Sequence, residues 1–462
     1  MAHLPLPAPA GRAAGDDFDA VCRLIREESR KIVVLDDDPT GTQTIHGLEV
    51  LTEWSVPALE RGLKDVRPGF FILTNSRALS EPAAVALNAG IADNLRKAAV
   101  TSGVDFSIIS RSDSTLRGHF AAEINVLAER SIEPVDGIVV IPAFFEGGRY
   151  TIENVHYVAQ GDVLIPAAET EFARDVTFGF RHSDLTRWIE EKTRGVVKAG
   201  QVRSISLETL RTAGAEGVRA RLALVHGTGL IIVNAENYRD MEAFVHGLLL
   251  AERDGKRFLF RTAASFVRIR AGITEQPLLA AGEIRDGSGN GGLVVVGSYV
   301  KKTSEQLEQA LSLPRVEPIE LVVDRLIDRR QGDLEIARVA AAAGEAIGRG
   351  VTALVFTSRS EKSALGRAGS LEVAQVVSNA LVGVLRSVRL RPSFVLAKGG
   401  ITSSDLAVKG LGVRSALVLG QVAAGVPVWQ IGEESLYPGL KYIIFPGNVG
   451  SRDSLRKLLT DL

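Results

Sequence analysis

Short apolar runs recur along the chain, and a polar or glycine-rich segment follows most of them. The N-terminal part contains KIVVL (31–35), GFFILT (69–74), FSIIS (106–110), GIVVI (137–141) and GLIIV (229–233). The C-terminal part contains GLVVV (292–296), ALVFT (353–357), SFVLA (393–397) and KYIIF (441–445). Their apolar residues are consecutive rather than alternating, which is typical of strands buried on both faces of a parallel sheet.

Helical patterns lie between these runs, for example over 82–99, 334–350 and 371–388. Alternation of strands and helices predicts an α/β fold. The polar, glycine-rich stretch EIRDGSGNGG (283–292) separates the two sets of strands and is typical of a linker. We therefore expect two α/β domains, 16–285 and 290–462, each with a mainly parallel sheet flanked by helices. The Ala-, Pro- and Gly-rich residues 1–15 are expected to form a flexible tail.

Composition narrows the possible partners. The chain has 462 residues, a length that two large domains satisfy. Its 54 Lys and Arg against 55 Asp and Glu give a net charge of -1, so we expect no nucleic-acid partner. A single cysteine, Cys22, excludes an intramolecular disulfide and any multi-cysteine metal site. No apolar stretch is long enough to span a membrane and the start does not resemble a signal peptide, which predicts a cytoplasmic protein.

Acidic and basic residues follow the strands of the first domain. Asp36, Asp37 and Asp38 come directly after KIVVL, Arg77 follows GFFILT, and Arg111 follows FSIIS. Ligands of open α/β sheets bind beyond the carboxyl ends of the strands. Three adjacent carboxylates require a cation, a basic partner or a raised pKa, and arginines bind carboxylates or phosphates. An acidic turn with structural salt bridges is the alternative interpretation.

Small residues follow three strands of the second domain. Gly297-Ser298 follows GLVVV, Lys398-Gly399-Gly400-Ile401-Thr402 spans the end of SFVLA, and Pro446-Gly447 follows KYIIF. Glycine lets backbone amides approach a ligand, and a helix start offers unpaired N–H groups. The three loops together favour a nucleotide phosphate site, although tight strand-to-helix turns would look similar. GSGNGG precedes a strand rather than following one, so a Rossmann site is not expected.

These motifs resemble those of the four-carbon acid sugar kinases, which phosphorylate tetronates such as threonate, erythronate and 3-oxo-tetronate on O4 with ATP. The motifs are residues 36–44, 74–77, SDSTLRG (112–118), 297–298, GGIT (399–402) and PGNVG (446–450). The resemblance implies an acid-sugar domain, a nucleotide domain and an active site in the cleft between them. The chain departs from the family pattern at Pro39, Gln43 and Ile401, the last of which replaces an acid.

The resemblance also implies a set of site residues. Substrate binding is expected at Asp36, Arg77, Arg111, Ser112, Asp113, Ser114 and Arg117, and ATP binding at Ser298, Gly399, Gly400, Ile401, Thr402 and Gly447. Asp37, with Asp36 as the alternative, would accept the proton from the attacking hydroxyl, while arginines clamp the substrate carboxylate. Mg²⁺ would be held mainly through water and phosphate, with no dedicated protein ligand set. The expected partners are a sugar acid and ATP, with a possible homodimer.

Two other functions are compatible with parts of the pattern. Asp36, Asp38 and Thr40 match the DxDxT start of haloacid-dehalogenase-type phosphatases, in which the first Asp is a nucleophile and the second an acid and base. The same two domains could also form a sugar-acid sensor without catalysis. Fold analogy alone does not separate these possibilities.

Overall fold

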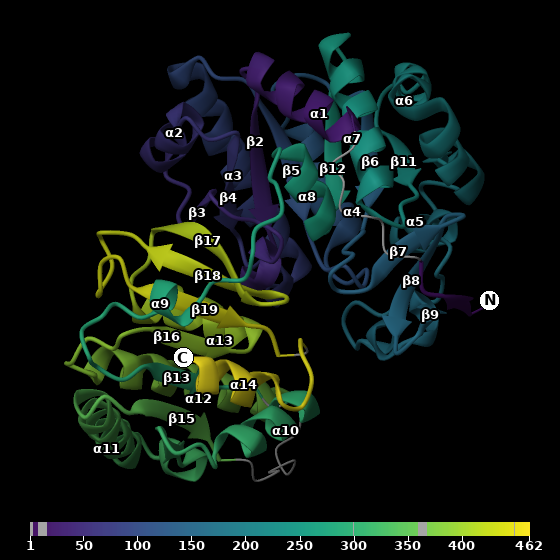
Figure 1. Ribbon diagram of the computed structural model, residues 1–462. Coiled ribbons are helices and arrows are strands. Elements are labelled where there is room, and N and C mark those ends of the chain that lie inside the picture. The colour runs from purple at the N-terminus through teal and green to yellow at the C-terminus, as the bar shows by residue number, and fades with distance from the viewer. Residues whose placement is uncertain (1–2, 8–15, 299, 359–366, 448) are drawn as a thin grey trace. The chain divides into compact units, whose positions relative to one another are not determined.

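Figure 1 shows the chain as a computed structural model, which describes residues 3–7, 16–298, 300–358, 367–447 and 449–462, with no side-chain description for 367–372. The chain divides into two compact units, Met1–Glu275 and Gln276–Leu462. Both units are α/β, as predicted. Of the expected tail, Leu4–Pro5 forms strand β1, which pairs with β9 (Val163–Pro166), and residues 1–2 and 8–15 lie outside the described residues.

The first unit is built on a sheet in which every neighbouring pair of strands is parallel. The predicted strands are all present, together with three that the apolar runs did not reveal. In spatial order the sheet comprises β10 (Arg203–Ile205), β11 (Gly229–Val233), β6 (Gly137–Ile141), β12 (Phe258–Thr262), β5 (Phe106–Arg111), β2 (Lys31–Asp36), β4 (Gly69–Leu73) and β3 (Glu49–Leu51).

Helices and a second, smaller sheet complete this unit (Figure 1). Apolar residues of the strands pack against helix residues in one core, which includes Val33, Phe70, Ile91 and Leu127. The small antiparallel sheet contains β1, β9, β7 (Arg149–Ile152) and β8 (Val155–Gln160). The helices are α1 (Asp16–Glu27), α2 (Val56–Lys64), α3 (Glu81–Ser102), α4 (Phe120–Glu129), α5 (Leu185–Lys192), α6 (Gly214–Ala223), α7 (Tyr238–Arg253) and α8 (Ala264–Arg270).

The second unit has a mixed sheet with its own apolar core, which includes Val294, Leu354, Phe394 and Ile443. In spatial order its strands are β14 (Val316–Leu321), β15 (Thr352–Thr357), β13 (Leu293–Val296), β16 (Val395–Lys398), β19 (Lys441–Phe445), β18 (Val426–Ile431) and β17 (Ser415–Ala423). The first five are parallel to one another, β18 is antiparallel to β19, and β17 is antiparallel to β18. The helices are α9 (Ala281–Ile284), α10 (Lys301–Ala310), α11 (Arg329–Gly348), α12 (Arg367–Ser387), α13 (Gly400–Asp405) and α14 (Ser454–Asp461).

Each unit has a point at which the strand order reverses. After β2 the chain builds β3 and β4 on one side and then crosses to β5 on the other side. After β13 it builds β14 and β15 on one side and then crosses to β16. Ligands of open α/β sheets bind at such reversal points, beyond the carboxyl ends of the strands. The topology therefore points to the segments that follow β2 and β13.

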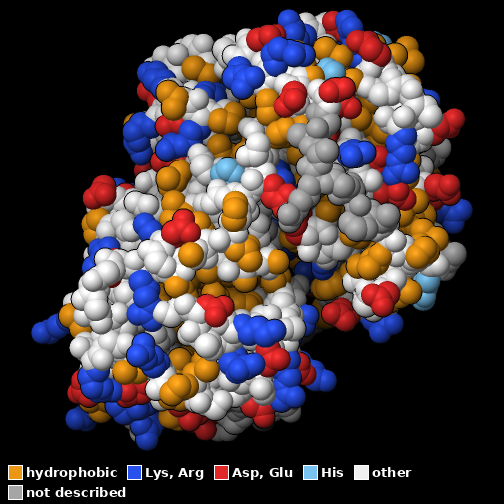
Figure 2. All heavy atoms as spheres, in the orientation of Figure 1, with side chains coloured by type: hydrophobic (Ala, Val, Ile, Leu, Met, Phe, Trp, Pro, Cys, Tyr) orange, Lys and Arg blue, Asp and Glu red, His pale blue; other side chains and the backbone are white. Residues whose placement is uncertain are grey.

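Lys and Arg side chains are interspersed with Asp and Glu over the face shown in Figure 2. No helix within the described ranges is long and apolar enough to cross a bilayer.

Close backbone packing in the second unit predicts opposite effects for two glycine-to-alanine substitutions. A Cβ at Gly291 would overlap the backbone carbonyl oxygen of Val351, whereas a Cβ at Gly344, inside α11, meets nothing within 4 Å. We expect Gly291→Ala to lower the free energy of unfolding by about 1–3 kcal/mol through overpacking. Gly344→Ala should leave it unchanged or raise it by up to about 1 kcal/mol through helix propensity. Thermal unfolding of both variants checks this, and equal midpoints would contradict the packing described here.

Candidate active site

Asp36 and Arg111 form a buried ion pair at the carboxyl end of the first sheet. They are register partners on β2 and β5, and Arg111 Nη1 lies 3.2 Å from Asp36 Oδ1. Burial raises the pKa of Asp36 to about 7, the Arg111 charge opposes this shift, and the neighbouring charge of Asp37 adds to it. A Cβ at Gly41 would overlap the Asp36 carboxylate, so the chain needs glycine where it passes this group. The Asp36 carboxylate is thus enclosed by the chain and held in an ion pair with Arg111.

One carboxylate oxygen of Asp37 accepts no hydrogen bond from the described residues. Ser112 Oγ donates a hydrogen bond to Asp37 Oδ2 at 2.5 Å, and the Ser112 backbone N–H donates to the Thr262 carbonyl. Asp37 Oδ1 is buried, receives no hydrogen bond from the described residues and lies 3.9 Å from Arg77 Nη1. A buried carboxylate oxygen without a donor is costly, so this atom is suited to accept a proton or hydrogen bond from a ligand.

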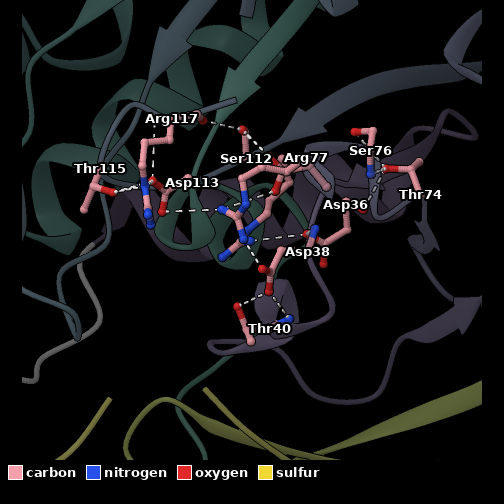
Figure 3. Close-up of polar contacts among 12 residues, drawn as sticks. Asp36, Asp38, Thr40, Thr74, Ser76, Arg77, Ser112, Asp113, Thr115 and Arg117 are labelled. Atoms are coloured by element: carbon pink, nitrogen blue, oxygen red, sulfur yellow. Dashed lines mark hydrogen bonds and ion pairs between the residues drawn. The ribbon is translucent and has the colours of Figure 1, made fainter. Parts of the chain in front are cut away.

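Arg77 lies between several carboxylates, as Figure 3 shows. Its guanidinium forms an ion pair with Asp38, and its Nη1 lies 3.6 Å from Asp113 Oδ1. Asp38 also caps the short helix Pro39–Thr42 by accepting hydrogen bonds from the backbone N–H and hydroxyl of Thr40, at 2.8 and 2.5 Å. The structure therefore brings Arg77 together with Asp37 and Asp38, which follow β2, and with Asp113 from the loop after β5.

The loop after β5 contains a second charged pair. Arg117 Nε donates to Asp113 Oδ2 at 2.7 Å, and Arg117 Nη1 lies 3.7 Å from Asp175 Oδ2. Burial by itself raises the pKa of Asp113, but the charges of Arg117 and Arg77 hold it well below its ordinary value. All three arginines predicted to bind substrate thus already have carboxylate partners within the protein.

Buried residues that the sequence did not reveal support this site. Glu123 on α4 accepts a hydrogen bond from Ser76 Oγ at 2.5 Å and one from Arg261 Nη1 at 2.7 Å. Arg261 comes from the end of β12, and its Nη1 also donates to Ser110 Oγ. The available signals were Glu123, an acid in the helix that follows the Ser112–His119 loop, and the arginine in FLFRT, but these two residues lie 138 positions apart in the chain.

His156 on β8 fixes the loop that carries Ser114. Its Nε2 lies 2.8 Å from the Ser114 carbonyl oxygen, and its Nδ1 lies 3.1 Å from Thr151 Oγ1. Burial lowers the pKa of His156 to about 4, so the ring is neutral at neutral pH. A neutral ring satisfies both contacts when Nε2 donates to the carbonyl and Nδ1 accepts from the hydroxyl. The backbone of Ser114 is therefore held by the small sheet.

In the second unit, the three small-residue loops meet at the ends of β13, β16 and β19. Thr303 Oγ1 lies 3.3 Å from Ser298 Oγ and donates to the Gly447 carbonyl at 3.1 Å. Gly399 has a φ of 118°, and a Cβ there would lie 2.9 Å from Ser298 Cβ. Four of the predicted residues therefore lie together: Ser298, Gly399, Thr402 and Gly447. Gly400 begins α13, and the next residue, Ile401, is 63% exposed.

Lys398 is a further residue of this second cluster. Its side chain is fully buried, its Nζ donates to the Pro446 carbonyl at 2.6 Å, and it lies 3.9 Å from the centre of the Phe445 ring. Burial, with a smaller contribution from the charge of Lys302, lowers the pKa of Lys398 to about 7. The ammonium thus ties the end of β16 to the loop that contains Gly447.

No group of three or more His, Cys, Asp or Glu within the described parts of the chain is arranged to hold a metal ion. Asp36 and Asp38 both have arginine partners. This donor set fits a Mg²⁺ that is held mainly by phosphate oxygens and water rather than by the protein.

Two family models match the chain. A sugar-binding N-terminal domain matches residues 32–270, and a nucleotide-binding C-terminal domain matches residues 293–455. The chain is 26% identical over 452 residues to a 3-oxo-tetronate kinase of Pseudomonas fluorescens, covering 92% of this chain and 96% of that one. It is 24% identical to a D-threonate kinase of Salmonella typhimurium, covering 86% and 90% of the two chains.

The chain belongs to the four-carbon acid sugar kinase family. As a member it is a phosphotransferase with an alcohol group as acceptor. The fold agrees with a solved structure from Haemophilus influenzae, with a TM-score of 0.62 at 19% identity, covering 93% of this chain and 99% of the other. A solved structure from Salmonella typhimurium gives a TM-score of 0.67 at 16% identity, covering 92% and 98% of the two chains.

Burial of Lys398 predicts a pH-dependent stability for this kinase. Its folded pKa of about 7 lies below the ordinary lysine value of 10.5, so the unfolded chain binds more protons between these limits. The stability contributed by this group therefore rises from pH 7 to pH 10 and is lost as the pH falls to 7. The melting temperature of the native protein should rise relative to that of Lys398→Met over this range. Lys301→Met, at a side chain 93% exposed, is the control and should give a constant difference. A constant difference for Lys398→Met as well would contradict the prediction.

Proposed function

We propose that the chain transfers the γ-phosphate of ATP to the terminal C4 hydroxyl of a tetronate such as threonate, erythronate or 3-oxo-tetronate. The observation that carries this proposal is the similarity to 3-oxo-tetronate and D-threonate kinases over at least 86% of the chain in both comparisons, combined with a charged cluster after β2 and small-residue loops after β13. The same comparisons leave the individual sugar acid open, since their identities are only 24–26%.

In this proposal Asp37 accepts the proton of the C4 hydroxyl. Its Oδ1 is buried and has no donor, while Ser112 holds its Oδ2 at 2.5 Å. Asp36 is a weaker candidate because its carboxylate is enclosed by Arg111 and by the chain at Gly41. Asp113 and Ser112 provide the polar groups that would bind the remaining substrate hydroxyls. A general base within hydrogen-bond reach is defined by geometry first and by its pKa second.

The nucleotide is assigned to the cluster of Ser298, Gly399, Gly400, Ile401, Thr402 and Gly447. A Cβ would lie 2.9 Å from Ser298 Cβ at Gly399 and 3.1 Å from Ser298 Oγ at Gly447, so the loops pack closely here, and glycine lets backbone groups approach phosphate oxygens. Mg²⁺, when bound with ATP, would neutralise phosphate charge. Phosphoryl transfer depends mainly on alignment and charge neutralisation, so the role of the protein is to hold both ligands in position.

The geometry does not suit the phosphatase alternative. That mechanism requires Asp36 as a nucleophile and Asp38 as an acid and base. Asp36 is 2% exposed and ion-paired with Arg111, and Asp38 is bound to Arg77 and to the Thr40 backbone. The interdomain active site, the homodimer and the cytoplasmic location implied above remain predictions.

Screening ADP release over C4 acid sugars, with C5 and C6 acids as controls, tests the proposed reaction. We expect ADP formation that requires a tetronate together with ATP. Phosphate release from phosphorylated compounds without nucleotide would instead support the phosphatase, and binding of both ligands without turnover would support a sensor.

Asp37→Asn should lower kcat by about 100-fold, at the low end of general-base effects, because the transition state of phosphoryl transfer is loose. KM for the tetronate should change little, and steady-state kinetics checks both values. Asp240→Asn is the matched control, since Asp240 is also buried, at 3% exposure, and is paired with Arg211 away from these loops. An unchanged kcat in the Asp37 variant would move the role of base to another residue.

Gly399→Val should weaken ATP binding by at least about 10-fold while leaving tetronate binding unchanged. The positive φ of Gly399 and its close approach to Ser298 leave no place for a side chain. Isothermal titration with each ligand separately checks this result. Normal ATP affinity in this variant would mean that the nucleotide binds elsewhere.

A further inference from the structure

Arg149 is a cation near the first cluster that has no carboxylate partner among the described residues. It begins β7, and its Nη1 donates to the Gly147 carbonyl. Its Nε is buried and has no hydrogen-bond acceptor. The three arginines expected to bind substrate differ from it, since each forms at least one ion pair with an aspartate.

One contact of Arg149 itself and one contact of its sheet place it beside the loop of Asp113 and Arg117. The guanidinium carbons of Arg149 and Arg117 lie 5.9 and 5.2 Å from the centre of the same ring, that of Phe172. The small sheet that carries Arg149 also carries His156, which contacts the Ser114 carbonyl at 2.8 Å. Strand β7, which begins at Arg149, is therefore held next to the candidate substrate site.

The electrostatic situation of Arg149 favours an incoming anion. Burial lowers its pKa, the charge of Asp113 raises it, and the neighbouring Arg117 charge lowers it. A guanidinium nevertheless stays charged in proteins, so a partly desolvated positive charge is left without an ion-pair contact among the described residues. Guanidinium groups bind carboxylates through two parallel hydrogen bonds, and the unused Nε provides one suitable donor.

We propose that Arg149 binds the carboxylate of the sugar acid and thereby sets the requirement for an acid rather than a neutral sugar. Arg77, Arg111 and Arg117 then serve to hold the aspartates in place. This inference rests on the proposed function and reassigns the carboxylate contact expected at Arg77 and Arg111.

The test compares a tetronate with the corresponding tetronamide, in which a neutral amide replaces the carboxylate. We expect the native enzyme to prefer the acid, both in kcat/KM and in direct calorimetric binding without ATP. Arg149→Met should weaken binding of the acid by about 10- to 100-fold, the range of a charge-assisted contact, and leave binding of the amide unchanged. Arg149→Lys keeps the positive charge but loses the two parallel N–H donors of the guanidinium, so it should retain part of the preference for the acid.

Arg111→Met is the matched control at a buried arginine. It should weaken both compounds alike, because it removes the partner of Asp36 rather than a contact with the carboxylate. The inference is overturned if Arg149→Met and Arg149→Lys keep the native preference, if either weakens acid and amide equally, or if Arg111→Met abolishes the preference. Failure of the native enzyme to bind or phosphorylate any tetronate would instead overturn the proposed function. Thermal unfolding verifies that each variant is folded.

Discussion

Charge compensation at the carboxyl end of β2 is the constraint on which the first unit depends. Asp36, Asp37 and Arg111 are each less than 5% exposed, and an isolated charge at such positions would be strongly destabilising. Pairing with Arg111 and Arg77 offsets that cost, and the buried Arg261–Glu123 pair supports the neighbouring strands in the same way. Loss of one member of a buried ion pair leaves the charge of the other member buried and unpaired, which is strongly destabilising. These side chains are therefore held in defined positions.

In both units the candidate residues lie near the point at which the strand order reverses, but the two sets of side chains differ in their chemistry. In each, the strand order reverses at one strand, β2 or β13, and the segment after that strand carries the candidate residues. In the first unit that segment carries Asp37 and Asp38, and their arginine neighbours Arg77 and Arg111 come from the segment after β4 and from the end of β5. The second unit brings glycines, hydroxyl groups and the buried Lys398 together at the ends of β13, β16 and β19, where the Lys398 ammonium donates to the Pro446 carbonyl. The difference between the two candidate sites thus follows from the side chains that occupy equivalent strand ends in the two units.

Sequence patterns revealed the strands that are buried on both faces, because such strands are continuously apolar. They did not reveal β17 and β18, which pair in antiparallel fashion, or β12, whose run is interrupted by Arg261. The positions of Asp36, Arg77 and Arg111 could be predicted because strand ends of a parallel sheet meet at one edge. Glu123 and His156 could not, since their roles depend on contacts made across 42 or more positions of the chain. The internal ion pairs of the predicted arginines correspond to the alternative interpretation of structural salt bridges, which the sequence left open.

The choice between Asp36 and Asp37 shows how geometry and pKa can give different answers. A pKa of about 7 would make Asp36 the better-matched base at neutral pH. That same pKa results from burial, which the two carboxylates share at 2% and 3% exposure, whereas the ion pair with Arg111 is made by Asp36. Asp37 has the unoccupied oxygen, and phosphoryl transfer asks less of the strength of the base than of its position. The raised pKa of Asp36 is therefore better explained as a consequence of packing charges together than as a catalytic adaptation.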